Sequence, residues 1–77
     1  MKPNQQELEA LLKSMLRLEF QTLTDKFKDS ESGIEARINE LAIERHIEST
    51  KAIADKFPCL WDLVTEMESD LMSELTK

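Results

Sequence analysis

The stretch from Ile34 to Phe57 is apolar on two opposite sides when it is placed on a helix at about 100° per residue. One side carries Ile34, Ile38, Leu41, Ala52 and Ile53, and the nearly opposite side carries Ala36, Ile43, Ile47, Ala54 and Phe57. A helix at the edge of a bundle needs only one apolar stripe, so this pattern predicts packing partners on two sides. We therefore expect this segment to be the middle layer of an assembly.

Two further segments have helical periodicity and complete the prediction of an all-α fold. Residues 4–28 carry a broad apolar face of about 200°, and residues 58–76 carry a single stripe. Between the segments lie the only glycine, Gly33, and Pro58, which disfavours helical geometry at the residue before it. Asn4 and Ser32 each precede a glutamate by three residues, which is typical of helix N-termini, with Ser30 as a competing cap. We predict one domain, residues 1–77, forming a three-helix bundle with helices at about 4–28, 33–56 and 58–76.

The small size of the chain adds a prediction of self-association. A core built from 77 residues is marginal, and a three-helix monomer would leave one side of the middle helix in water. We therefore predict a homodimer or higher assembly, with Ile43 and Ile47 at the oligomer interface. Ile38, Leu41 and Ile43 are all expected to be buried, with Ile43 on a different contact surface from Ile38.

Composition and charge narrow the environment and the partners of the chain. No apolar run exceeds three residues, which predicts neither a membrane-spanning helix nor a secretory signal, and a cytoplasmic location is expected. Cys59 is the only cysteine, so no internal disulfide is possible. The net charge is −6 and no basic cluster is present, so direct binding to nucleic acid or to anionic membranes is not expected.

Catalytic and cofactor signatures are not found in the sequence. His46 is the only histidine, and although it lies among charged residues, no second ligand is at metal-binding spacing. A single glycine cannot build a phosphate-binding loop or a nucleophile elbow. We predict a non-enzymatic protein without cofactor or metal, in which His46 is a partly buried histidine that is hydrogen-bonded to its neighbours in the bundle.

The most unusual feature of the sequence is its regular spacing of acids, in two rows that repeat every four residues: Asp62, Glu66, Asp70 and Glu74, and Glu40, Glu44 and Glu48. Like charges at this spacing destabilise a helix slightly, so an uncompensated row suggests a use for it. One interpretation is a solvated acidic face. The other is recognition of a basic surface, including mimicry of the charge pattern of nucleic acid. Because Glu66 and Asp70 lie away from the apolar stripe, reversing both to lysine is expected to preserve the fold.

The segment 57–61 concentrates two of the four aromatic residues, Phe57 and Trp61, at the second helix junction. It either closes the end of the bundle or provides a hydrophobic anchor for a partner. The leading hypothesis is a small acidic regulatory protein that binds a basic protein partner. In its most specific form it is an inhibitor of a nucleic-acid-handling protein, of the anti-defence or transcription-inhibitor type that phages encode. The alternative is a structural or adaptor bundle whose acids only confer solubility.

Overall fold

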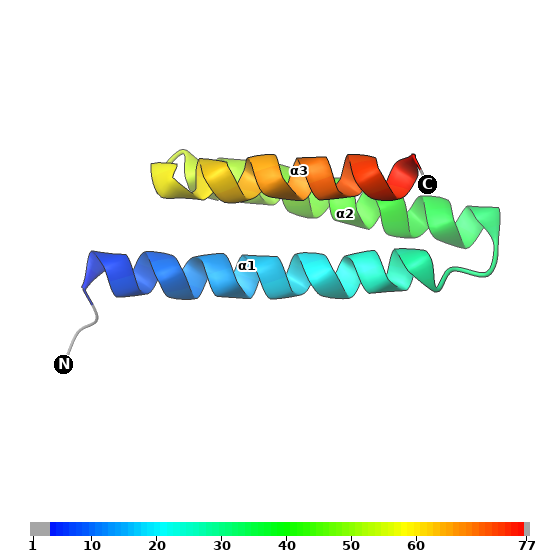
Figure 1. Ribbon diagram of the computed structural model, residues 1–77, viewed down its shortest axis with the longest axis horizontal. Coiled ribbons are helices and arrows are strands. Elements are labelled where there is room, and N and C mark those ends of the chain that lie inside the picture. Colours follow the sequence, from blue (N-terminus) through cyan, green and yellow to red (C-terminus); the bar gives the residue numbers. More distant parts are fainter. Residues whose placement is uncertain (1–3, 77) are drawn as a thin grey trace.

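The computed structural model describes residues 4–76, which form three helices side by side (Figure 1). Helix α1 spans Gln5–Lys28, α2 spans Gly33–Ala54 and α3 spans Trp61–Leu75, with a short 3₁₀ turn, η1, at Pro58–Leu60. The described part of the chain contains no strand, so the prediction of an all-α chain of three helices is confirmed. None of the helices formed by these residues is long and apolar enough to cross a bilayer.

Local sequence signals position the starts of the two long helices. The side chain of Asn4 accepts a hydrogen bond from the backbone N–H of Glu7 at 2.8 Å, and Ser32 accepts one from Glu35 at 3.0 Å. These bonds satisfy N–H groups that have no partner within the helix. Ser30, the competing cap, instead donates its hydroxyl to a carbonyl in the last turn of α1.

The junction between α2 and α3 is set by Pro58. Helix α2 ends at Ala54, two residues earlier than the expected end at residue 56. Phe57 has φ −128° and ψ 79°, outside the helical region, because the ring of the following proline excludes helical geometry there. The chain then turns through η1, with Pro58 in its first turn, before α3 begins at Trp61.

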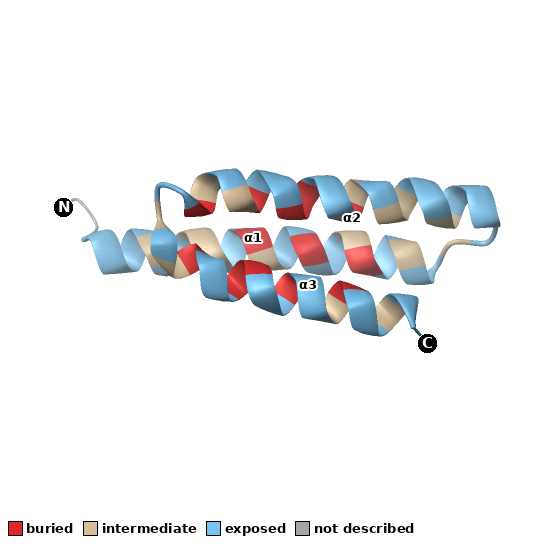
Figure 2. Cartoon of the chain, turned by 90° about the horizontal axis from the view of Figure 1, so that it is seen from above, coloured by how far each residue is buried: buried red, intermediate tan, exposed pale blue. Residues whose placement is uncertain are grey.

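The core lies where all three helices meet, as the red segments in Figure 2 show. Its fully buried side chains include Ile43, Leu60, Met67 and Thr50. The Thr50 hydroxyl donates to the His46 carbonyl at 2.9 Å, so this buried polar group is satisfied within its own helix. The remaining buried apolar side chains come from every helix: Leu16, Phe20, Ile47, Ala54, Leu63, Val64 and Leu71.

One apolar side of α2 is buried within the single chain and the other is exposed, which is the reverse of the expected assignment of the interface. Ile43 and Ile47, expected between copies, are 0% and 4% exposed inside a single chain. Ile38 and Leu41, expected to be buried, are 61% and 45% exposed. The physical reason is the position of α3, which packs with α1 on the Ile43 side of α2 and leaves the opposite side without a layer.

Candidate protein-binding surfaces

The acidic row on α3 faces α1 and meets a cation there. Arg17 places its Nη2 atom 3.0 Å from the Glu66 carboxylate and 3.0 Å from the Asp70 carboxylate. Its guanidinium carbon also lies 5.8 Å from the centre of the Phe20 ring, within the range of a cation–π contact. Reversing Glu66 and Asp70 to lysine would therefore place three cations together, contrary to the expectation that the fold tolerates this change.

The end of the same row is compensated as well. Lys28 Nζ lies 3.3 Å from the Glu74 carboxylate. Within residues 4–76, Asp62 is the one member of the α3 row that forms no ion pair. The row therefore does not present a continuous line of uncompensated charge, because bases from α1 form ion pairs with three of its four acids.

The acidic row on α2 likewise has one acid without an ion pair among the described residues. Arg37 Nη1 lies 3.0 Å from Glu40, and this hydrogen bond and the charge of Glu40 raise the pKa of the guanidinium. Lys51 Nζ lies 3.4 Å from Glu48. Glu44, between these two pairs, has no hydrogen bond or ion pair to any described residue, and its carboxylate is exposed.

Glu44 and Glu48 border a shallow groove between α2 and α3, which we call the α2–α3 groove. Its volume is about 270 Å³, and it is lined by Glu44, Ile47, Glu48, Glu68, Leu71 and Met72. Lys51 crosses one side of it, with Nζ 2.7 Å from the Glu68 carboxylate, and this hydrogen bond raises the pKa of Lys51. The groove thus combines an apolar floor with an acidic rim. The two predicted rows do not share one surface, because the acids of α3 turn toward α1 instead.

The segment 57–61 has residues in positions that fit both predicted roles, closure of the bundle end and a hydrophobic anchor. Leu60 is fully buried, and Phe57 and Cys59 are half-buried against the core, as expected for the closed end of a bundle. Trp61 is 41% exposed. Trp61, Glu68 and Met72 follow the spacing i, i+7 and i+11, which places them along one side of α3. The tryptophan therefore extends the side of α3 that borders the α2–α3 groove.

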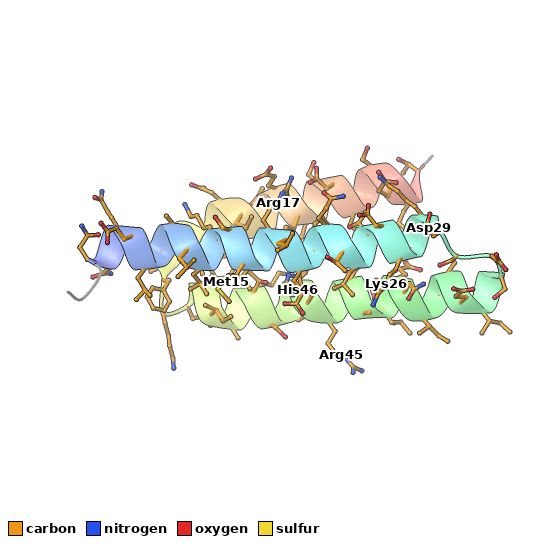
Figure 3. The ribbon with its side chains drawn as sticks, turned by 90° about the horizontal axis from the view of Figure 1, so that it is seen from below. Met15, Arg17, Lys26, Asp29, Arg45 and His46 are labelled. Atoms are coloured by element: carbon orange, nitrogen blue, oxygen red, sulfur yellow. The ribbon has the colours of Figure 1, made fainter. Side chains whose placement is uncertain are left out.

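His46 lies between α1 and α2 and is buried (Figure 3). Its Nε2 atom is 2.9 Å from the Leu16 carbonyl oxygen, which only accepts, so Nε2 carries the proton. Its Nδ1 atom lies 3.6 Å from the Glu19 carboxylate. No three His, Cys, Asp or Glu side chains among residues 4–76 are grouped so that they could hold a metal ion.

An apolar surface on the outer side of α1 and α2 is exposed in the single chain, as expected for a three-helix monomer that leaves one side of the middle helix in water. On α1 it consists of Leu8, Leu11, Met15 and Leu18, here called the α1 patch. On α2 it consists of Ile34, Ile38 and Leu41, here called the α2 patch. The width of about 200° predicted for the apolar face of the first helix agrees with the α1 patch, because a helix that packs on one side of a bundle needs a narrower stripe.

Cys59 gives a direct test of the environment at the closed end of the bundle. Partial burial raises the pKa of its thiol, and a hydrogen bond to Glu9 and the charge of that carboxylate raise it further. Only the thiolate is nucleophilic, so we expect iodoacetamide to alkylate Cys59 more slowly than free N-acetylcysteine at about pH 8. Glu9→Gln should accelerate the reaction, as measured by intact-mass spectrometry. A rate above that of the free thiol would contradict this environment.

Comparisons of the chain with protein-family models, with curated proteins and with solved structures gave no match.

Proposed function

We propose that this chain is a non-enzymatic regulatory protein that acts by binding another protein with a basic surface, and that it works as a homodimer. The observation that carries this proposal is the α2–α3 groove, where the unpaired Glu44 and two carboxylates that share Lys51, Glu48 and Glu68, border an apolar floor. A basic amphipathic segment of a partner complements such a groove, because its apolar side chains cover the floor and its lysines or arginines meet the rim.

Two further features support this assignment. The net charge of −6 favours approach of a positively charged partner before contact. Trp61 is exposed on the same side of α3 as Glu68 and Met72, which line the groove, and tryptophan is enriched among the residues that dominate binding energy. In its most specific form the proposal is an inhibitor of a nucleic-acid-handling protein, because the phosphate-binding surfaces of such proteins are rich in lysine and arginine. A cytoplasmic location is part of the same proposal.

A structural or adaptor role is the second candidate, and a specific observation favours it. Arg17 and Lys28 compensate three acids of the α3 row, so those acids already stabilise the packing of α3 on α1. In an adaptor the remaining acids only keep the protein soluble. Assembly would then depend on apolar side chains and would change little with salt.

The two candidates differ in their dependence on Glu44. This residue has no ion pair with any other part of the described chain, so Glu44→Lys should leave the fold intact. The matched control is Glu31→Lys in the α1–α2 connection, which changes the net charge equally but lies outside the groove. Each protein is immobilised and used to capture partners from a lysate of the organism that encodes it. We expect Glu44→Lys to lose a basic protein that the wild type and Glu31→Lys both retain.

Salt supplies the second measurement in this test. The Debye length falls from about 10 Å at 0.1 M to about 3 Å at 1 M ionic strength, so capture by an acidic groove should weaken steeply. Circular dichroism verifies that all three proteins are equally helical. Equal capture by the wild type and Glu44→Lys, or capture that is insensitive to salt, would favour the adaptor role.

A further inference from the structure

The α1 patch and the α2 patch lie on the same side of the molecule. A groove of about 440 Å³ separates α1 from α2 on that side, lined by Leu16, Glu19, Leu23, Ala42, Arg45, His46, Ser49 and Ile53. Met15 and Leu18 flank Glu19 on α1, and Ile38 and Leu41 line an adjoining hollow together with Ala42 and Arg45. In Figure 3, Met15 lies on the α2 side of α1 and Arg45 points away from the bundle. We call this side the α1–α2 face.

The two patches occupy opposite ends of the α1–α2 face. The α1 patch spans residues 8–18 of α1 and the α2 patch spans residues 34–41 of α2, so each is centred toward the N-terminal end of its helix. The two helices run in opposite directions (Figures 1 and 2). The His46–Leu16 hydrogen bond fixes their relative register. Residues 19 and 45 therefore lie at the same level, midway between the patches. The α1–α2 face thus has an apolar patch at each end and two opposite charges, Glu19 and Arg45, at its centre.

We propose that a second copy of this chain covers the α1–α2 face. A homodimer with two-fold symmetry uses the same surface on both copies. A two-fold axis that runs along the face, from the α1 patch to the α2 patch, brings each patch against the same patch of the other copy. This arrangement removes seven half-exposed or exposed aliphatic side chains per copy from water: Leu8, Leu11, Met15, Leu18, Ile34, Ile38 and Leu41.

The charges at the centre of the face fit the same axis. Arg45 forms no hydrogen bond or ion pair with the described residues, and the Glu19 side chain is 64% exposed, with its carboxylate 3.6 Å from His46 Nδ1. The two residues lie on opposite sides of the line that joins the patches, because one is on α1 and the other on α2. The two-fold rotation exchanges the two sides of this line, so Glu19 of each copy meets Arg45 of the other.

The dimensions of the chain agree with this use of the face. A stable interface takes about 800 Å² from each partner. The molecule measures 48 × 21 × 18 Å, so one long side offers a projected area on the order of 1,000 Å². A dimer of this size therefore needs most of one side, and the α1–α2 face is apolar at both of its ends.

The first test compares two methionines of equal exposure. Met15 is 59% exposed in the α1 patch, and Met72 is 61% exposed beside the α2–α3 groove. Sedimentation equilibrium of the purified wild type should give a mass twice that of the 8.9-kDa chain. Met15→Glu should raise the dissociation constant by roughly tenfold or more, since the axis places the two introduced carboxylates together. Met72→Glu should leave the constant unchanged. A monomeric wild type at all concentrations, or a dimer that only Met72→Glu weakens, would overturn the proposal.

The second test examines the position of the axis. Arg45→Glu and Glu19→Arg should each weaken self-association, because each homodimer then opposes like charges at both central contacts. A mixture of the two variants should form a heterodimer in which both contacts are complementary. Native mass spectrometry resolves this species, because the two variants differ in mass. The wild-type affinity should return in the mixture, and a mixture that remains monomeric would overturn this arrangement.

This inference gives the proposed homodimer its surface, and it is independent of the basic partner. Both experiments use the purified chain alone. Failure to capture a basic protein therefore leaves the dimer measurements unaffected, and a monomeric chain leaves the Glu44→Lys comparison unaffected.

Discussion

Ile43→Ala is expected to lower the free energy of unfolding by about 2–5 kcal/mol, because it removes three carbons from a side chain that is fully buried between the helices. Domains of this kind have only about 5–15 kcal/mol in total, so a large fraction of the variant should be unfolded under mild denaturing conditions. Urea unfolding followed by far-ultraviolet circular dichroism, which reports helix content, measures the change.

Ile38→Ala is the matched control for this substitution, with the same chemistry on the opposite side of α2. Ile38 is 61% exposed in one chain, so its loss should cost less than about 1 kcal/mol in the dissociated protein. Both variants are compared at a concentration below the dimer dissociation constant, so that only folding of the single chain is measured. Equal destabilisation by the two substitutions would contradict the assignment of the core to the Ile43 side.

His46→Ala is expected to cost about 2–4 kcal/mol, since it combines a cavity with the loss of a buried hydrogen bond. The imidazole fills space between α1 and α2, and its Nε2–H donates to the Leu16 carbonyl at 2.9 Å. His46→Phe separates the two contributions, because it keeps most of the volume and removes the bond. Its cost should be about 1 kcal/mol if packing is the larger part.

Ser49→Ala, one turn away in the same helix, is the control for His46. Ser49 is exposed and its side chain has no hydrogen bond, so the change should lie within about 0.5 kcal/mol of the wild type. Differential scanning calorimetry of the four proteins gives the order of stability. A His46→Ala variant as stable as Ser49→Ala would show that the imidazole makes no net contribution to folding.

Features that depend on neighbours in the sequence were predictable. The caps at Asn4 and Ser32 follow from a side chain and an N–H group three residues apart, and the break at Pro58 follows from the proline ring. These interactions are local, so the sequence contains all the groups that take part. The hydrogen bonding of His46 within the bundle was predicted by elimination, since no second ligand was present for any other role, and its burial is more complete than the partial burial expected.

Features that depend on where α3 docks were not predictable. The two apolar sides of α2 have the same aliphatic chemistry, so the pattern identifies two sides without indicating which one α3 covers. The acidic row on α3 was likewise predicted to be uncompensated, because its partner, Arg17, lies on another helix far away in the sequence. A helical wheel describes one helix alone and therefore does not predict ion pairs between helices.

The unequal lengths of the helices affect how the chain opens locally. Helix α3 has 15 residues whereas α1 and α2 have 24 and 22, and the first turns of α1 and α2 extend past their neighbours at opposite ends (Figure 2). Hydrogen bonds in these turns are supported by caps and not by tertiary packing, so they open with small free energies. Amide hydrogens there should exchange with deuterium long before those near Ile43. Burial of the same turns between two copies would slow that exchange, so the ends of the long helices report on association without any substitution.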